Sequence, residues 1–389
     1  MFGINKKSLL LPPIVALVIA FIFSLVLIPS AKQTPKQLPL AIVNEDQGAI
    51  GKTMVETIEK TSQATTGDSK PVVKWIAVST TEEAIAGMNN QKYYGALVLP
   101  KDFSEKQASL KTASPSQPEI VIYVNQGKNA LAANTVTQML NGMVDGMNKT
   151  VSQQLLAGLK QQGATLTADQ AALLASPILK TVNPVNQTGK LANAPASLFQ
   201  PLWMASLVAA AIMWMNVRKT EASTKKKSLN HKGIQILAGA VAALVTGFGL
   251  TWFAEGILGF DFPSFSDTAI FLSIASFSFF SIIRAVLEWL GFAALPVFAL
   301  VLFFGGPLLA MAPEIMPAFY KDWIYGWLPM RFMVDGLREL FFFGKGLSWS
   351  QPTAVLVWIA IGSIAVFALS VFKPKAKAAA DKPVAVSAE

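Results

Sequence analysis

Six stretches of mostly apolar residues constrain this chain more than any other feature of its sequence. A helix needs about 20 consecutive apolar residues to cross the hydrocarbon core of a membrane. The stretches that approach this length are 9–28, 197–217, 233–258, 268–287, 290–312 and 353–372. Only 14% of the residues are charged, whereas soluble domains carry about 25%. The sequence therefore predicts a membrane protein rather than a soluble globular enzyme.

The first stretch has two readings, a membrane anchor or a cleaved signal peptide. Its apolar run from Ser8 to Ile28 exceeds the roughly 7–15 residues of a typical signal sequence. Pro29 also stands where a signal peptidase prefers a small side chain. We therefore expect an uncleaved first span.

Lysine and arginine in short loops predict the orientation, because cytoplasmic loops carry an excess of them. One side of the predicted spans holds most of these residues, namely Lys6, Lys7, Arg218, Lys219, Lys225, Lys226, Lys227, Lys232, Arg284, Lys373, Lys375, Lys377 and Lys382. The other side holds Lys321, Arg331, Arg338 and Lys345. This bias predicts a multi-pass protein of the plasma membrane with both termini cytoplasmic. The net charge of +9 then reflects topology, and no nucleic-acid partner is expected.

The spans divide the chain into four parts. These are the N-terminus with the first span (1–29), an external domain (30–196), a five-helix membrane domain (197–372) and a cytoplasmic tail (373–389). In the external part, apolar strand-like runs at 38–43, 72–78, 94–99 and 120–124 alternate with helical patterns. Such alternation predicts an α/β sheet. The fold class expected is a polytopic α-helical membrane protein with six transmembrane helices and an extracytoplasmic α/β domain inserted between the first two.

The rest of the external part is predicted to be less compact. Helical patterns at 129–162 and 166–179 suggest an arm or stalk above the membrane. The segment 182–195 is rich in Asn and Pro, which is typical of a linker.

The sequence contains few of the residue types that commonly carry out catalysis or bind metals. There is no cysteine, and His231 is the one histidine. No nucleophile–base set and no metal-ligand spacing is visible, so we expect no enzyme, no catalytic residues, no cofactor and no metal site.

Two charged groups on the predicted cytoplasmic side are candidate sites. The first is the basic loop with Arg218, Lys219, Lys225, Lys226, Lys227 and Lys232. It either follows from topology and attraction to anionic lipid or docks a cytoplasmic protein. The second is the pair Arg284 and Glu288, four residues apart on one helix face. This pair either closes a turn at the interface or takes part in gating or partner contact.

Three further patterns concern the membrane part. Gly239, Ala243 and Gly247 recur every four residues, which permits close helix packing within the chain or across a dimer. Pro296 and the segment 305–307 should bend or break the fifth span. The segment 328–343 reads as an outer amphipathic or re-entrant helix, with charged residues on one face: Arg331, Asp335, Arg338 and Glu339.

Three local patches, in this order and spacing, resemble a known family. They are residues 40–46 (LAIVNED), 94–104 (YGALVLPKDFS) and 328–339 (LPMRFMVDGLRE). With one span before a large external domain and five spans after it, the chain resembles the YhgE/Pip family, within the exporter-type ABC transporter permease superfamily.

The resemblance implies a permease subunit without an ATPase domain of its own, working as a homodimer or heterodimer in the lipid bilayer. A separate cytoplasmic ABC ATPase would power export of a hydrophobic or amphipathic substrate. Some proteins that look like YhgE/Pip members serve instead in phage docking or secretion. The alternative is thus a non-transporting envelope protein whose external domain binds a partner, a secretion system or phage.

Overall fold

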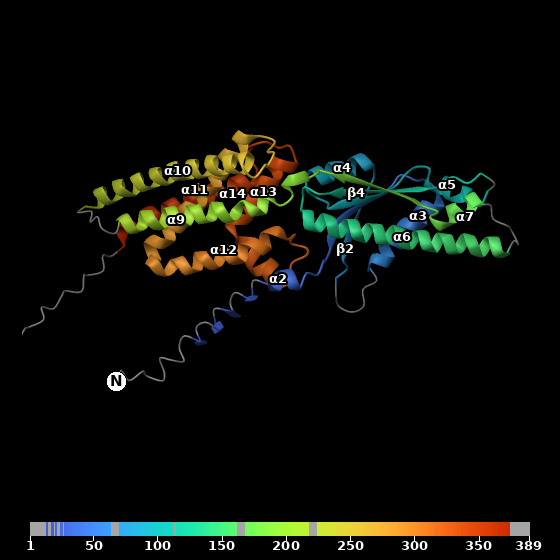
Figure 1. The fold of residues 1–389 in the computed structure, drawn as a ribbon, viewed down its shortest axis with the longest axis horizontal. Coiled ribbons are helices and arrows are strands. Elements are labelled where there is room, and N and C mark those ends of the chain that lie inside the picture. The colour runs from blue at the N-terminus through green and yellow to red at the C-terminus, as the bar shows by residue number, and fades with distance from the viewer. Residues whose placement is uncertain are drawn as a thin grey trace, which may run out of the picture.

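The computed structural model describes residues 27–63, 70–112, 114–161, 168–217 and 224–373, with a few short pieces between 13 and 25. The first predicted span, 9–28, and the tail beyond Lys373 lie largely outside these residues. The described chain is elongated, with a helix bundle at one end and a sheet with its own helices at the other (Figure 1). A helical membrane protein with an α/β region is therefore present.

A five-stranded mixed sheet forms the α/β region, in the order β2-β1-β3-β4-β5. Strands β1, β2 and β3 are parallel, β4 is antiparallel to β3, and β5 is parallel to β4. The strands are β1 (Leu38–Asn44), β2 (Val73–Val78), β3 (Gly95–Leu99), β4 (Glu119–Asn125) and β5 (Leu179–Val185). The first four coincide with the predicted strand-like runs.

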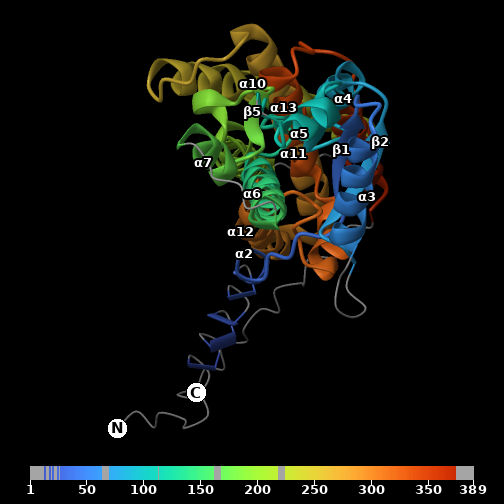
Figure 2. The same cartoon turned by 90° about the vertical axis from the view of Figure 1, so that its right-hand side faces the viewer.

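Both faces of the central strands are buried, which explains their continuous apolar sequences. Leu40 and Ile42 of β1 point into the core that also holds residues of α3 (Ala49–Gln63) and α6 (Ala130–Gln161). Ala41 and Val43 point to the opposite face, where α4 (Thr81–Asn89) packs. The sheet thus lies between α4 on one side and α3 and α6 on the other (Figure 1, Figure 2).

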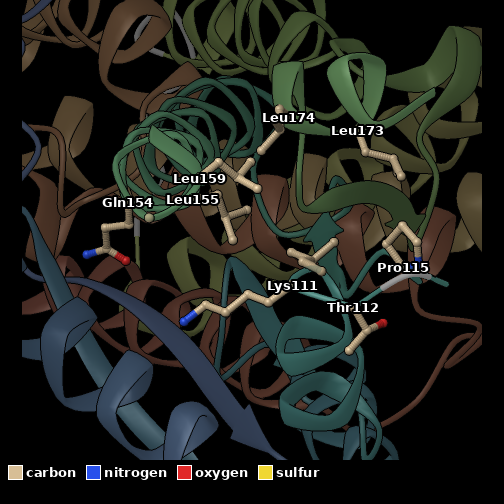
Figure 3. Close-up of a pocket in the computed structure, with 10 residues that line it drawn as sticks. Lys111, Thr112, Pro115, Gln154, Leu155, Leu159, Leu173 and Leu174 are labelled. Carbon is tan, nitrogen blue, oxygen red and sulfur yellow. The ribbon is translucent and has the colours of Figure 1, made fainter. Parts of the chain in front are cut away.

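Part of the predicted arm, residues 129–162, forms helix α6, which covers one face of the sheet. The first half of α6 buries Val136, Leu140 and Val144 in the core beneath the sheet, while its second half extends past the sheet toward α7 (Ala168–Ala175). Near α7 and α5 (Phe103–Ser109), a cavity of about 180 Å³ is lined by Leu155, Leu159 and Leu174 (Figure 3).

The linker prediction for 182–195 is wrong in its first part. Residues 182–185 belong to the edge strand β5, which pairs with β4 over seven residues. Pro184 is tolerated there because an edge strand leaves one row of backbone groups unpaired. The chain then passes through the short helices η1 (Gly189–Leu191) and α8 (Ala194–Ser197) into the bundle.

Four helical runs of the described residues are long and apolar enough to cross a membrane: Gly189–Asn216, Lys225–Gly256, Phe265–Ala310 and Gln351–Phe372. They contain α9 (Phe199–Val217), α10 (Lys225–Gly256), α11 (Phe265–Leu290), α12 (Leu295–Ala310) and α14 (Gln351–Leu369). Helix α11 is the centre of the bundle and contacts α9, α10 and α14.

The run Phe265–Ala310 contains two helices, because the chain turns between them. Gly291 ends α11 with a φ of +69°, a left-handed conformation that glycine adopts without strain. The 3₁₀ turn η2 (Gly291–Ala294) follows, and Pro296 then stands in the first turn of α12. Pro296 therefore lies at the start of α12 and does not break it, and the turn at 291–294 is the connection between α11 and α12. Pro307 lies inside α12, which continues to Ala310 without ending there.

The small residues of α10 pack against α11 within this chain. A Cβ atom on Gly239 would overlap the ring of Phe280, and one on Gly247 would overlap Ser273 and the backbone of α11. Ala243 is buried on the same face. The close approach of these two helices accounts for the four-residue spacing.

The predicted amphipathic segment forms α13 (Pro329–Phe342). It follows a π-turn, η3 (Tyr320–Ile324), and a 3₁₀ turn, η4 (Tyr325–Trp327). The buried face of α13, with Met333, Leu337 and Leu340, packs toward α11 and α14. This places α13 at the end of the bundle that meets the sheet (Figure 1).

Candidate functional site

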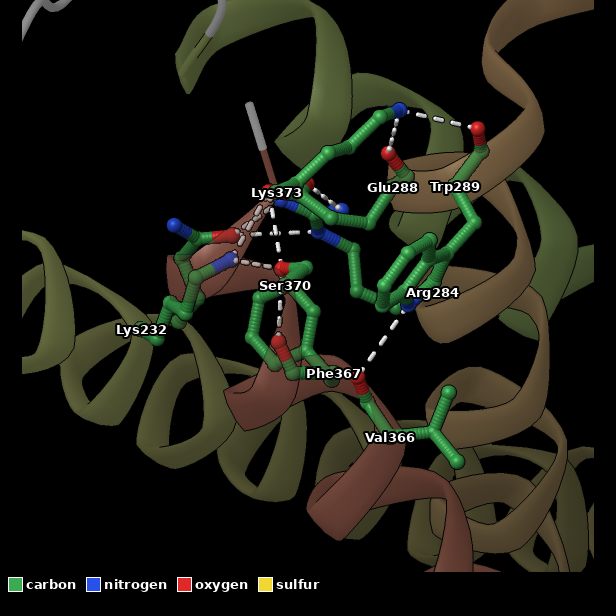
Figure 4. Close-up of polar contacts among 9 residues, drawn as sticks. Lys232, Arg284, Glu288, Trp289, Val366, Phe367, Ser370 and Lys373 are labelled. Atoms are coloured by element: carbon green, nitrogen blue, oxygen red, sulfur yellow. Dashed lines mark hydrogen bonds and ion pairs between the residues drawn. The ribbon is translucent and has the colours of Figure 1, made fainter. Parts of the chain in front are cut away.

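A cluster of charged side chains joins α10, α11 and α14 (Figure 4), at the end of the bundle farthest from the sheet (Figure 1). Arg284 Nη1 lies 2.8 Å from Glu288 Oε2, across one turn of α11. Lys232 Nζ, on α10, lies 2.7 Å from Glu288 Oε1 and also donates to the Ser370 hydroxyl. One carboxylate therefore holds two cations from two helices.

Neutral groups complete the cluster. Gln235 Oε1 accepts hydrogen bonds from Arg284 Nε at 3.0 Å and Nη2 at 2.6 Å. The ring of Phe367 lies 4.1 Å from Lys232 Nζ and 4.5 Å from the Arg284 guanidinium carbon. Arg284 is 2% exposed and Lys232 is 5% exposed, so these contacts replace the water that both cations lose on burial.

The cluster joins three helices at one point. Lys232 comes from α10, Arg284 and Glu288 from α11, and Phe367 from α14. Nearby, the Trp289 indole donates to the backbone oxygen of Val366, and Lys373 Nζ donates to the backbone oxygens of Glu288 and Trp289. The cluster is therefore a polar clamp among the helix ends.

The residues predicted as one docking loop lie in different surroundings. Arg218 and Lys219 lie outside the described residues. Lys225, Lys226 and Lys227 form the exposed first turn of α10, since this helix begins eight residues earlier than the predicted span. Lys232 lies within α10 rather than in a loop, and its side chain is buried against Glu288.

A second polar site lies where α13 meets the sheet region. A cavity of about 260 Å³ is lined by all four predicted charged residues of α13, Arg331, Asp335, Arg338 and Glu339, together with Gln91, Tyr94, Lys128 and Glu314. We refer to it as the junction cavity. The charged face of α13 thus faces the α/β region.

Hydrogen bonds tie the walls of the junction cavity together. Tyr94 Oη donates to Glu314 Oε2 at 2.7 Å, and Gln91 Nε2 donates to Glu339 Oε1 at 3.4 Å. Burial, with the negative charge of Glu314, raises the pKa of Tyr94 well above its usual value. Its phenol therefore stays protonated and remains a hydrogen-bond donor.

Two more ionisable groups of the cavity are shifted by burial. Burial raises the pKa of Asp335, against the opposing effects of Arg338 and Arg331. Burial lowers the pKa of Lys128 to about 8. Sequence reasoning missed Tyr94, Lys128 and Glu314, because no local pattern relates them to α13.

The first two sequence patches named above are also joined to each other. Ser104 Oγ donates to the Asp46 carboxylate, and Gly51 N–H donates to Ser104 Oγ at 3.1 Å. Thr81 donates twice to Glu45, and these bonds lower the pKa of Glu45. Asp46 and Glu45, the acidic residues after β1, thus hold the neighbouring segments in place through hydrogen bonds.

The described residues contain no group of three or more His, Asp or Glu side chains arranged to hold a metal ion.

Comparison with known proteins gives the family of this chain. The family described as ABC-2 family transporter protein matches residues 7–372. The chain belongs to the ABC-2 transporter family. The match includes the bundle with its buried cluster, the sheet region and the junction cavity between them.

A curated relative supports the more specific resemblance. This ABC-2 family chain is 24% identical over 162 residues to YhgE of Bacillus subtilis (strain 168), a protein of uncharacterized function. The match covers 39% of this chain and 20% of that relative, so the chain spans about a fifth of the length of YhgE. The chain, a member of the ABC-2 family, is thus similar to YhgE over part of its length.

One solved structure is also similar in part. It is a crystal structure of a domain of a protein described as an ABC type-2 transporter, from Thermotoga maritima MSB8. The identity is 19%, the match covers 38% of this chain and 86% of that domain, and the TM-score is 0.23.

Proposed function

We propose that this chain is the membrane-spanning subunit of an ABC exporter that relies on a separate cytoplasmic ATPase. The observation that carries the proposal is the ABC-2 family match over residues 7–372. A hydrophobic or amphipathic substrate would leave the cell beside the sheet region. The active unit would be a homodimer or heterodimer of permease subunits.

The proposed topology has six transmembrane helices. Residues 9–28 form the first, and α9, α10, α11, α12 and α14 form the other five. The first turn of α10, with Lys225–Lys227, lies at one end of the bundle, and the α/β region lies at the other end (Figure 1). This separation supports the arrangement. Residues 30–196 then lie outside the cell, and both termini and the first turn of α10 lie in the cytoplasm.

The exposed first turn of α10 is the proposed contact for the ATPase. Lys225, Lys226 and Lys227 are exposed, and the same helix carries Lys232 into the buried cluster two turns later. A force applied to this turn would reach Glu288 through Lys232. The cluster would then switch the helix ends between inward-facing and outward-facing states.

Co-purification can test whether this chain binds a separate ATPase. The full chain, tagged and expressed in its native host, is extracted in mild detergent, and partners are identified by quantitative mass spectrometry. We expect a P-loop ATPase in near-stoichiometric amount. We further expect the triple reversal K225E/K226E/K227E to lower its recovery at least fivefold at equal membrane abundance.

A matched control variant distinguishes the loss of a specific docking site from a general effect of changed net charge. Lys52, Lys149 and Lys160 are exposed on the sheet region, so K52E/K149E/K160E changes the net charge equally at the other end of the molecule. It should retain the ATPase. Recovery of only envelope or secretion proteins with the wild-type chain would refute the exporter proposal and favour an anchored external domain.

The topology can be tested without background because the chain has no cysteine. Single variants K149C and K226C place one thiol at each end of the molecule. In intact cells, a membrane-impermeant maleimide should label K149C, and it should label K226C only after permeabilisation. The reverse pattern would overturn the proposed orientation, and the cysteine-free parent provides the blank.

A further inference from the structure

Two cations of the junction cavity, Arg331 and Lys128, form no salt bridge with a carboxylate of the described residues. Arg331 forms no salt bridge with the described residues, and its Nε is buried without a hydrogen-bond partner. Its guanidinium carbon lies 4.5 Å from the centre of the Phe332 ring and 5.3 Å from that of Tyr325. Aromatic faces thus hold Arg331 in place while its N–H donors remain available.

Lys128 is placed in a similar way on the opposite wall. Its Nζ lies 4.0 Å from the centre of the Tyr94 ring and donates to the backbone oxygen of Lys92 at 3.3 Å. An ammonium group carries three donors, so two remain. A half-buried ammonium that neighbours an aromatic ring and a carbonyl is only partly compensated.

The acidic residues of the cavity are already engaged by other groups. Asp335 accepts from Arg338 Nη1 at 3.1 Å, and Glu339 lies 3.0 Å from Lys345 Nζ. Glu314 accepts from the Tyr94 hydroxyl at 2.7 Å, a neutral donor that leaves the negative charge of Glu314 near Lys128. Among the described residues, Arg331 and Lys128 are the cations of the cavity that form no salt bridge, so their free N–H donors can meet an additional negative charge.

The position of the cavity indicates where such a charge could come from. Exposed Trp323, Trp327 and Trp349 belong to the same end of the bundle, as expected at the headgroup level of a membrane. The exposed residue Gln351 is part of the lining, so the cavity reaches the surface. Ligand pockets for drug-sized molecules begin near 300 Å³, so about 260 Å³ suits a small anionic group.

We propose that the junction cavity binds a phosphate-bearing anion through Arg331 and Lys128. A guanidinium fork and an ammonium are the side chains that bind phosphate oxygens in proteins. The phosphate could belong to a lipid headgroup at the membrane surface or be free in solution. The lipid source depends on the membrane placement given under Proposed function, whereas the free source does not.

The altered pKa of Lys128 is consistent with this role. Burial lowers its pKa to about 8, because the charged form loses hydration, and the negative charge of Glu314 offsets only part of this effect. A bound phosphate would stabilise the ammonium and raise the pKa again. Binding is thus expected to weaken above pH 8, where Lys128 loses its proton.

The test uses the full chain and two probes. In neutral detergent, inorganic phosphate is titrated by calorimetry at constant ionic strength, with chloride as the counter-anion. In nanodiscs of phosphatidylcholine with phosphatidylglycerol, lipid adducts that survive detergent release are counted by native mass spectrometry. The variants are R331Q and K128Q, with R331K as the charge-retaining variant.

Lys321 provides the matched control. It is exposed at the same end of the bundle and is not part of the cavity lining, so K321Q removes one positive charge without changing the cavity. We expect R331Q and K128Q each to weaken binding at least tenfold. R331K should retain part of it, and K321Q should match the wild-type protein.

Each outcome has a defined meaning. Retained phosphatidylglycerol adducts that R331Q removes would identify a lipid headgroup, and phosphate binding without adducts would identify a free anion. No binding of either probe, or equal loss in K321Q, would overturn the proposal. Since K225E/K226E/K227E leaves the cavity intact, that variant should bind normally even if the exporter proposal fails.

Discussion

Replacement of Glu288 by Gln should destabilise the helix bundle strongly, because Glu288 is the carboxylate that both buried cations contact. Removing one partner of a buried ion pair costs about 3–5 kcal/mol. The Glu288 side chain is 26% exposed, so water will screen part of the loss. We therefore expect E288Q to lower the free energy of unfolding by about 2–4 kcal/mol.

Removal of Lys232 should cost much less, although it is the more deeply buried partner. The cluster of Lys232, Arg284 and Glu288 carries a formal charge of about +1, since each side chain is ionised at neutral pH. K232M leaves the Arg284–Glu288 pair intact and neutral, whereas E288Q leaves two buried cations. We expect K232M to change the free energy of unfolding by no more than about 1 kcal/mol.

Gln235 allows a rescue that depends on charge and geometry together. It already accepts two hydrogen bonds from Arg284, so Q235E would place a carboxylate opposite the same guanidinium. The double variant E288Q/Q235E should recover at least half of the stability lost in E288Q. A double-mutant cycle over the two sites measures this coupling.

The assay is reversible unfolding of the full chain in mixed micelles, followed by tryptophan fluorescence. Trp289 lies beside the cluster and donates to Val366, so its emission should report the loss of this region. Equal destabilisation by E288Q and K232M, or no rescue by Q235E, would refute the charge-balance reasoning.

Three further predictions test the packing and the pH dependence. G239L should destabilise the bundle by about 1–3 kcal/mol, because its side chain would meet Phe280 of α11. G249L, at an exposed position with open space around it, should have little effect in the same unfolding assay. N125A should lower the melting temperature of the purified chain, because it removes a buried amide that donates to two backbone carbonyls and unsatisfied carbonyls cost about 1–3 kcal/mol. The folded-state pKa of Lys128, about 8, lies below its usual 10.5, so the unfolded chain binds more protons between these values. Stability should then rise with pH across this window, and K128Q should flatten the rise in phosphate-free unfolding curves.

The sheet was predictable where burial shaped the sequence. Strands β1 and β3 are covered on both faces, so their residues form short apolar runs that stand out from their surroundings. Strand β5 gives no such signal because most of its side chains are exposed, including Leu179 and Val182. Asn183 and Pro184 then make the strand look like a linker. Its pairing with β4 is visible only in three dimensions.

The buried cluster was half predictable for a similar reason. Arg284 and Glu288 are four residues apart on one helix, and local spacing alone brings such side chains together. Lys232 is 56 residues away from Glu288 in sequence. Its recruitment depends on how α10 packs on α11, and this packing depends in turn on the small side chains of Gly239 and Gly247.

The junction cavity was the least predictable feature. The amphipathic pattern of α13 correctly separates a charged face from an apolar face, but it does not tell what the charged face meets. Tyr94 and Glu314, which face it together, are 220 residues apart in sequence. A helix face that meets lipid headgroups and one that meets the α/β region would both be charged. The sequence pattern of α13 alone therefore cannot tell which of the two its charged face contacts.

Helix α11 connects the buried cluster with the wall of the junction cavity. Its 26 residues contain neither Gly nor Pro and extend over about 39 Å at 1.5 Å per residue. Arg284 and Glu288 lie near one end. Near the other end, the ring of Phe271 fills the space left by Gly336 of α13, where any Cβ would overlap it. An unbroken helix transmits a shift at one end to the other, so the Phe271–Gly336 contact is where movement at the cluster would reach α13 and the charged side chains it turns toward the sheet.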